Sequence, residues 1–375
     1  MEKRALLAVI LSLLVFFLYQ YLSEPDRPTP VDRKTAEREI TKPGREKSAD
    51  LTRKESILRE GRAEKPLLKV QEAMEAEEKE LVVRTDSYTA IFTTRGAKLK
   101  SWRLAKYKDS IGEGAESIEL VMADKPEEYP LGLEFSDSTL QSLGDAVFKV
   151  DKDSLSLTGR QEQGTVSFSW VSPEGVEVIK TFTFYQGKYL VDLDISILNL
   201  SNIQIKKGTS LSWKRKLDPA KDVDRWSFSG PVALVNGELE EVPVKKLDEE
   251  RIHDGEIKWA GYEDKYFISS IIPSKSGNLR LRMSKSPEDV VSVGITEPTE
   301  LNRGEKASYR YSLYLGPKDL DILKSVGADL QKAINFGWFD VIAKPLLIFL
   351  KYINKFTHNF GVAIILLTVV IKILF

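Results

Sequence analysis

Strict alternation of apolar and polar residues is the feature that most constrains the fold of this chain. It recurs in short runs between Leu81 and Pro317, and turn signals such as Gln186-Gly187 and Asn236-Gly237 separate the runs. Alternation of this kind places one face of each strand on a core and the other in water, as in antiparallel sheets. We therefore expect an all-β domain over residues 81–317, built as a large sandwich of two sheets. The apolar positions of four runs are Val166, Phe168 and Trp170; Val191, Leu193, Ile195 and Ile197; Leu279, Leu281 and Met283; and Tyr309, Tyr311, Leu313 and Leu315.

The predicted sandwich carries few residues that point to catalysis. Its one histidine, His253, lies beside Asp254 and near Glu256. A lone histidine makes neither a catalytic triad nor a metal site, and no phosphate-binding glycine loop, EF-hand loop or nucleophile elbow occurs. We predict no cofactor and no metal for this domain. Whether a groove between the sheets binds a peptide or a sugar stays open.

Composition narrows the remaining function classes. The 375 residues carry a net charge of -1, no cysteine and two histidines. The lack of cysteine excludes disulfides, thiol catalysis and cysteine-ligated zinc. A nearly neutral chain without a long basic block does not match a nucleic-acid-binding surface, so we expect no nucleic acid partner.

Residues 1–22 form the first predicted membrane element. Lys3 and Arg4 precede an uncharged run that ends at Leu22, which is at the short end of the lengths that span a bilayer. The run ends in interface-type aromatic residues and no small-residue cleavage site follows, so an uncleaved anchor is favoured over a cleaved signal peptide. The positive flank predicts a cytoplasmic N-terminus, with the β domain on the other side of the membrane.

The charged stretch at residues 23–80 is predicted to be a linker. Between Glu24 and Glu80 it holds 14 Lys/Arg and 15 Asp/Glu residues. Such a segment cannot bury enough apolar area to offset the entropy of ordering its backbone. We expect it to serve as a tether.

Helical spacing returns after the sandwich, over residues 318–335. We expect one helix here that leaves the sandwich and couples it to the segment that follows. Its apolar stripe consists of Leu320, Leu323, Val326, Leu330 and Ala333.

Residues 336–358 have the pattern of an amphipathic helix. Lysines and a histidine lie on one face, and bulky apolar residues lie on the other. Pro345 lacks the N–H that would bond back four residues, so the helix is expected to begin near residues 340–344. The pattern suits a membrane surface, and a soluble helix packed on a core is the alternative. The polar face holds Lys344, Lys351, Lys355 and His358, and the apolar face holds Ile342, Leu346, Phe349, Leu350, Ile353 and Phe356.

Residues 359–375 contain an apolar run with one lysine. From Val362 to Phe375 a helix would be about 21 Å long, against about 30 Å for a bilayer core, so the span is expected to be incomplete within the sequence. Lys372 follows Thr368 by four residues and shares its helix face. The lysine is either an end-of-helix anchor or a group that faces a wet cavity.

Four stretches of the sequence resemble the YidC-type membrane protein insertases of Gram-negative cell plans, and the resemblance covers the whole chain. The stretches are LVVRTDSYTAIFTTRGAKLKSWRLAKY (residues 81–107), YLGPKD (314–319), GWFDVIAKPLLIFLKYI (337–353) and NFGVAIILLTVVIK (359–372). The resemblance implies a β-supersandwich similar to galactose-mutarotase-type folds, an interfacial helix at 336–358, and the start of a second transmembrane helix at 359–375.

The same resemblance implies a substrate groove that is hydrophilic and open to the cytoplasm and lipid. The functional residue of that groove in the family is an arginine in the second transmembrane helix, and Lys372 falls at this position, while Thr368 matches the groove threonine. Lysine keeps the positive charge but loses the planar fork of arginine. The interfacial helix would contribute Lys344, Pro345, Lys351 and Lys355.

The function implied is that of a membrane protein insertase and folding chaperone, not an enzyme. Its expected place is the cell inner membrane, multi-pass, with the large domain periplasmic. Its expected partners are nascent membrane proteins, components of the secretion translocon and the lipid bilayer. One alternative is a membrane-anchored periplasmic binding or assembly-adaptor protein for a sugar or peptide. The least supported alternative is a sugar epimerase. The resemblance to mutarotase-type folds would imply catalysis by a histidine–glutamate pair with further histidines, and the domain has only His253.

Overall fold

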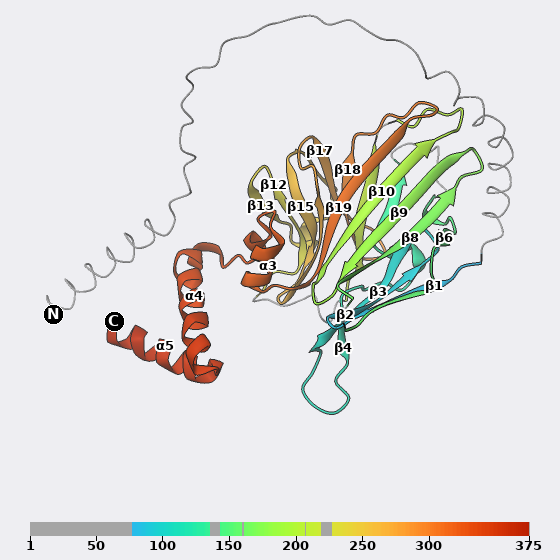
Figure 1. Ribbon diagram of the computed structural model, residues 1–375. Helices are drawn as coiled ribbons and strands as arrows, with labels where there is room; N and C mark the ends of the chain where they lie inside the picture. Colours follow the sequence, from blue (N-terminus) through green and yellow to red (C-terminus); the bar gives the residue numbers. More distant parts are fainter. Residues whose placement is uncertain (1–76, 136–142, 160, 207, 219–226, 375) are drawn as a thin grey trace, which may run out of the picture. The chain divides into compact units, whose positions relative to one another are not determined.

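The computed structural model describes residues 77–135, 143–159, 161–206, 208–218 and 227–374 (Figure 1). The predicted anchor at 1–22 and all but the last residues of the predicted linker at 23–80 lie outside the described residues. The chain divides into two compact units at residue 335. We call the described part before it the β unit (77–334) and the described part after it the helical unit (335–374).

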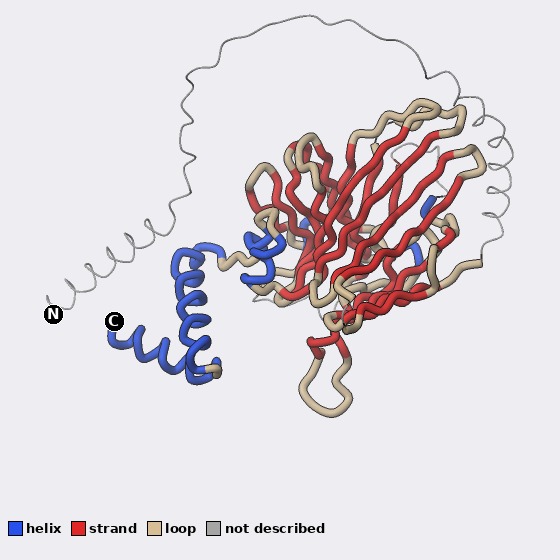
Figure 2. Tube along the Cα trace, viewed as in Figure 1, coloured by secondary structure: helices blue, strands red, loops and turns tan. Residues whose placement is uncertain are grey.

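A nine-stranded sheet is the largest element of the β unit, and strands dominate this unit in Figure 2. Strand β19, the last in the chain, lies inside the sheet between β10 and β16 and pairs antiparallel with both. In spatial order the strands are β13 (Glu238–Glu241), β12 (Gly230–Val235), β15 (Ile257–Glu263), β16 (Phe267–Pro273), β19 (Lys306–Pro317), β10 (Leu190–Asn199), β9 (Val176–Tyr185), β8 (Gln163–Val171) and β6 (Lys149–Val150).

Two five-stranded sheets complete the described strands, and we name them the β1 sheet and the β18 sheet. The β1 sheet runs β4 (Ser117–Glu119), β3 (Lys98–Lys108), β2 (Tyr88–Thr93), β1 (Glu80–Thr85) and β7 (Ser154–Leu157). The β18 sheet runs β14 (Arg251–Gly255), β17 (Leu279–Lys285), β18 (Val290–Glu297), β11 (Thr209–Lys216) and β5 (Gly132–Phe135). Short 3₁₀ turns η1 (Pro126–Glu128) and η3 (Val244–Lys246) lie in the connections.

The first core lies between the β1 sheet and the nine-stranded sheet. Phe92 of β2 packs against Phe182 of β9 with ring centroids 4.8 Å apart. The indole N–H of Trp102, on β3, donates to the carbonyl of Leu315 on β19 at 3.1 Å. Aromatic burial and this buried hydrogen bond both help to hold the two sheets together.

The second core lies between the β18 sheet and the other half of the nine-stranded sheet. Strand β15 contacts β17, β18 and β11. Trp213 of β11 and Trp259 of β15 are both buried there. Both five-stranded sheets thus pack on the nine-stranded sheet.

The all-β prediction for this region is confirmed, and the alternation seen in the sequence matches the burial pattern of β8, β10, β17 and β19. Two details differ from expectation. The strands form three sheets in the described region where two were expected, because the nine-stranded sheet is long enough to cover two partners. One pair is parallel, since β7 adds beside β1 in the same direction.

The expected single helix over residues 318–335 is wrong. Helix α3 (Leu320–Val326) ends at Gly327, and a 3₁₀ turn, η4 (Leu330–Ala333), follows. Three consecutive residues with positive φ, Gly327 to Asp329, break the helix, because L-residues in a continuing α-helix keep φ negative.

This segment also folds onto the β unit instead of leaving it. Leu323 and Leu330 are fully buried. Lys258 of β15 pairs with Asp329 at 2.7 Å, and Lys332 donates to the carbonyl of Gly237, in the β12–β13 turn, at 3.0 Å. The apolar stripe predicted from the sequence is therefore real, but it is buried against the sandwich.

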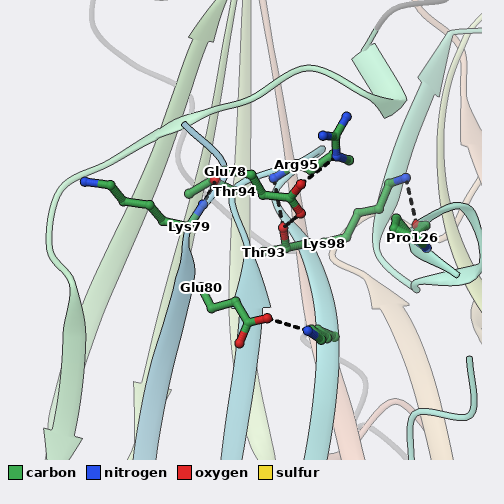
Figure 3. A network of polar contacts seen from close by, with 9 residues as sticks. Glu78, Lys79, Glu80, Thr93, Thr94, Arg95, Lys98 and Pro126 are labelled. Carbon is green, nitrogen blue, oxygen red and sulfur yellow. Dashed lines mark hydrogen bonds and ion pairs between the residues drawn. The ribbon is translucent and has the colours of Figure 1, made fainter. Parts of the chain in front are cut away.

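A polar network fixes the chain where it enters the β unit (Figure 3). The Glu78 carboxylate accepts from the Thr93 hydroxyl at 2.7 Å and from Arg95 Nε at 2.9 Å. The Thr93 hydrogen bond, more than the charge of Arg95, lowers the pKa of Glu78. Next to it, the backbone N–H of Lys79 donates to the Thr94 hydroxyl at 2.8 Å.

Candidate functional site

The helical unit carries every site residue predicted from the sequence. It consists of a 3₁₀ turn, η5 (Gly337–Phe339), helix α4 (Asp340–Thr357) and helix α5 (Phe360–Leu374). Lys344, Pro345, Lys351 and Lys355 lie on α4, and Thr368 and Lys372 lie on α5. The structure therefore places the two predicted groups on separate, consecutive helices that contact each other.

Helix α4 has the two faces that the sequence predicts. At about 100° per residue, its lysines form one stripe and Ile342, Phe349 and Phe356 form another. None of its described side chains is buried. Its apolar side chains therefore remain largely exposed, although the rings of Tyr352 and Phe356 contact each other with centroids 5.0 Å apart. The exposed apolar residues of α4 are Val341, Ile342, Ile348, Phe349, Tyr352 and Phe356.

The first turn of α4 is fixed by Asp340. Its carboxylate accepts from the backbone N–H of Phe336 at 2.8 Å and pairs with Lys344 at 2.5 Å, one turn further on. A negative charge at a helix N-terminus also interacts favourably with the helix dipole. The helix begins at Asp340, within the range expected from Pro345, which lies inside the helix at its sixth position.

A tight polar turn joins α4 to α5. His358 takes up a left-handed conformation with φ of 51° and donates its N–H to the carbonyl of Asn354 at 2.8 Å. Asn359 then accepts from the N–H of Val362 with its side chain, at 3.3 Å, and from Ala363 with its carbonyl, at 3.0 Å. Ala363 is fully buried. The Thr357-His358-Asn359 sequence thus ends one helix and begins the next.

Thr368 and Lys372 lie one turn apart on α5, and both side chains are exposed. The Thr368 hydroxyl donates to the carbonyl of Ile364 at 2.8 Å. This bond satisfies the hydroxyl within its own helix, as threonines in apolar helices commonly do. The surrounding exposed residues of α5 are apolar, among them Ile365, Val369 and Ile373. Lys372 is the one charged group of this helix.

Across the described residues, no helix has both the length and the mean hydropathy that crossing a bilayer requires. Helix α5 has 15 residues. The same residues contain no group of three or more His, Cys, Asp or Glu side chains placed to hold a metal ion.

Lys180 is the most buried charged group of the β unit, and the sequence reasoning missed it. It points inward from β9 with no exposed surface. Its ammonium donates to the carbonyls of Gly96, Ala97 and Leu131 at 3.0, 3.1 and 2.8 Å. Burial, followed by the charge of Lys98, lowers the pKa of Lys180 to about 7. Its position between Val178 and Phe182, two inward residues of an alternating strand, was the signal that could have revealed it.

Glu263, at the end of β15, is another deeply buried ionisable group. It is 1% exposed, and its carboxylate lies 3.0 Å from Lys318 Nζ, just after β19. Burial raises the pKa of Glu263 to about 7, against the opposing effect of the Lys318 charge. This ion pair fixes the point where the chain leaves the last strand.

A cleft of about 880 Å³ lies over the β18 sheet. It crosses all five strands, and its lining is mostly polar. His253 is not among the lining residues, whereas its neighbour Asp254 is, because successive residues of β14 point to opposite faces. The lining residues include Glu134, Ser210, Ser212, Asp254, Arg280, Arg282, Ser292, Gly294 and Thr296.

Comparison with known sequences identifies relatives along the whole chain. The YidC periplasmic domain family matches residues 80–349. A membrane protein insertase YidC of Syntrophus aciditrophicus is 34% identical over 382 residues, which covers 100% of this chain and 70% of that protein. A membrane protein insertase YidC of Geobacter metallireducens is also 34% identical, over 379 residues, covering 100% of this chain and 68% of that protein.

Solved structures also align with the β unit, at low sequence identity. A putative aldose 1-epimerase of Escherichia coli aligns with a TM-score of 0.44 and 9% identity, covering 64% of this chain and 100% of that one. A galactose mutarotase related enzyme of Lactobacillus acidophilus aligns with a TM-score of 0.45 and 10% identity, covering 63% of this chain and 97% of that one.

Proposed function

The chain belongs to the YidC family of membrane protein insertases, and from this premise we propose that it inserts client helices through a hydrophilic groove whose positive charge is the Lys372 ammonium. The supporting observation is the placement of Thr368 and Lys372 one turn apart among exposed apolar side chains. A lysine deep in hydrocarbon costs about 2.5–3.5 kcal/mol. A water-lined groove on that face of α5 removes this cost.

Insertion then proceeds by partition and needs no covalent chemistry. The acidic N-terminal tail of a client enters the groove, where the Lys372 charge offsets part of the tail's desolvation. The client's apolar helix passes sideways into lipid, and burial of its side chains drives the step. The membrane potential contributes about 2.3 kcal/mol per charge per 100 mV as the tail is released.

Helix α4 lies at the interface between the membrane and water. Its lysines, Lys344, Lys351 and Lys355, face headgroups and water while its exposed apolar stripe enters the acyl region. We propose that the protein lies in the cell inner membrane as a multi-pass protein with a cytoplasmic N-terminus. The β unit then lies in the periplasm. Nascent membrane proteins are its clients, and it works alone or beside the secretion translocon.

Substitution of Lys372 in the full-length protein tests the groove charge. With a single-span client that has an acidic N-terminal tail, we expect Lys372→Ala to lower insertion about tenfold. This corresponds to about 1.4 kcal/mol, well below the limit of about 4 kcal/mol for one charge pair at an effective dielectric of 20. Lys372→Glu should lower insertion further by repulsion, and Lys372→Arg should preserve it. The measurement is protease protection of the client tail in reconstituted vesicles.

Lys324→Ala is the matched control, because Lys324 is an exposed lysine on α3. It should insert the client at the rate of the unmodified protein. Normal insertion by both Lys372→Ala and Lys372→Glu would show that the groove does not depend on this cation.

A further inference from the structure

The cleft over the β18 sheet has a layout that insertion does not explain. Strand register brings its side chains into two rows across the sheet. In the first row the middle positions are small and the outer positions are long and charged, so the sheet face forms a trough. The first row is Glu134, Ser210, Thr296, Arg280 and Asp254. The second row has small residues up to Arg282 and ends at the exposed Ile252; it is Gly132, Ser212, Gly294, Arg282 and Ile252.

The charges at the edges of the trough neutralise one another. Arg280 forms a two-pronged pair with Asp254, at 2.7 and 3.1 Å. Arg282 lies 3.0 Å from Glu250. On the opposite edge Lys214 lies 3.1 Å from Glu134. The trough therefore offers no net charge to an anionic lipid, a nucleic acid or an acidic peptide.

The floor of the trough has unused hydrogen-bonding capacity. Ser212 is 4% exposed, and its hydroxyl has no hydrogen-bond partner among the described residues. A buried hydroxyl without a partner is costly, so it indicates a missing polar ligand or water. The hydroxyls of Ser210, Ser292 and Thr296 line the same floor. At the edge, the pair with Asp254 engages two of the five N–H donors of Arg280.

Gly294 keeps the floor open. A β-carbon at this position would lie 3.1 Å from the Ser210 hydroxyl and 3.9 Å from the β-carbon of Ser212. A side chain here would therefore fill the middle of the trough. The glycine lies in a central strand, where it weakens the sheet, and glycines in such positions often mark a place where a ligand or another backbone approaches closely.

We propose that this trough binds a neutral, hydroxyl-rich ligand, namely a short segment of a glycan. A dense array of hydroxyls beside paired Arg and Asp side chains matches a ligand that both donates and accepts hydrogen bonds at many positions and carries no charge. An extended peptide would need apolar pockets for alternate side chains, whereas the middle of the floor is serine, threonine and glycine, and the apolar lining is limited to Phe135, Leu279 and Pro298. A volume of about 880 Å³ suits a ligand of a few sugar rings.

The test is titration of the detergent-solubilised full chain with neutral oligosaccharides. Maltohexaose and chitotetraose are the probes, a serine- and asparagine-rich neutral peptide is the competitor class, and calorimetry is the readout. We expect millimolar or tighter binding of at least one oligosaccharide. Gly294→Val should weaken it at least tenfold by filling the trough, and Ser212→Ala should weaken it about fivefold.

The matched control is Ser196→Ala on β10, outside the trough. It should bind the oligosaccharide as the unmodified chain does, and equal melting temperatures show that Ser212→Ala and Gly294→Val are folded. Binding of neither oligosaccharide overturns the proposal. Binding that survives Ser212→Ala and Gly294→Val places the sugar elsewhere, and Ser212-dependent binding of the peptide instead assigns the trough to peptides; either result also overturns it. Client insertion is a separate readout, and its loss or survival does not bear on the trough.

Discussion

Lys180 connects all three sheets of the β unit through one ammonium group. Its side chain comes from β9 of the nine-stranded sheet, two of its acceptors lie in the β2–β3 turn of the β1 sheet, and the third, Leu131, leads into β5 of the β18 sheet. Ala97 and Leu131 both have positive φ, at 46° and 67°. These two residues keep an unfavourable backbone conformation while their carbonyls bind the same cation.

Replacing Lys180 by methionine should destabilise the β unit. The change leaves three buried carbonyls without a donor, and each such group costs about 1–3 kcal/mol. This loss is partly offset because Lys180, with a pKa of about 7 when folded, has to give up its proton on folding at pH 9, and methionine does not. We expect a loss of about 2–4 kcal/mol at pH 9 by urea unfolding followed by tryptophan fluorescence. Lys306→Met, at an exposed position of β19, is the control and should change the free energy of unfolding by less than about 0.5 kcal/mol. An unchanged Lys180→Met protein would mean that water replaces the ammonium.

Part of the role of Lys180 could be predicted from the sequence. Alternation in β9 places Lys180 on the inward face with Val178 and Phe182. Its three acceptors, however, lie 84, 83 and 49 residues away along the chain. No local pattern reveals which distant turn supplies a carbonyl, so the role of Lys180 needed the folded arrangement.

At the scale of elements, α4 shows that the spacing of residues along the sequence can predict which side chains share a helix face. The lysine stripe and the apolar stripe were both visible in the sequence, and the helix begins within the expected range. The segment at 318–335 shows the limit of predicting a helix from residue spacing. Its apolar stripe was correct, but the left-handed run from Gly327 to Asp329 was not recognised. Gly327 was a usable signal, because glycine commonly ends helices.

The absence of cysteine from the chain makes α4 directly testable. Single nitroxide labels at Phe349→Cys and Lys351→Cys should report opposite environments in liposomes. We expect the label at 349 to be accessible to oxygen, which concentrates in lipid, and the label at 351 to be accessible to a water-soluble nickel chelate, because the two stripes of an interfacial helix meet different solvents. Power-saturation EPR measures both accessibilities. A label at Ser196→Cys on β10 provides the aqueous reference, and equal nickel accessibility at 349 and 351 would contradict an interfacial α4.

At the scale of the whole molecule, two buried groups give stability a defined pH dependence. Glu263 has its pKa raised to about 7 when folded, so between its unfolded value of about 4.3 and pH 7 the folded state holds the extra proton. Stability from this group therefore falls as pH rises through that range. Lys180 has its pKa lowered to about 7, so between pH 7 and its unfolded value of about 10.4 the unfolded state holds the extra proton. Stability from this group rises with pH there.

Together the two groups should produce a minimum in their contribution to the free energy of unfolding near pH 7. Each slope is limited to about 1.4 kcal/mol per pH unit for one proton. Glu263→Gln should reduce the acid-side slope, and Lys180→Met should reduce the alkaline-side slope. Glu297, whose pKa burial also raises, and Lys98, whose pKa burial also lowers, keep their own contributions. Urea unfolding at pH 5, 7 and 9 measures both slopes. Variants that keep the unmodified slopes would assign the pH dependence to other groups.

The fold class was predictable from the sequence, but the arrangement of the sheets was not. Alternation identified β8, β10, β17 and β19 and their buried faces. It contained no information on which strands pair, and β10 pairs with β19 across more than a hundred residues of sequence. The cleft could not be predicted from the sequence for the same reason. Arg280 and Arg282 were visible as the polar face of one strand, whereas the serines and the glycine beside them come from β11 and β18.

The position of β19 determines how the β unit would respond to mechanical tension. This strand is paired with β10 over residues 306–314 and with β16 over residues 311–317, so its two ladders overlap in its second half. A pull on the outgoing chain would load both ladders in shear, so many bonds would have to rupture together, whereas an edge strand would peel away one bond at a time. Force applied to the chain after β19 would therefore be resisted by the hydrogen bonds to both neighbouring strands.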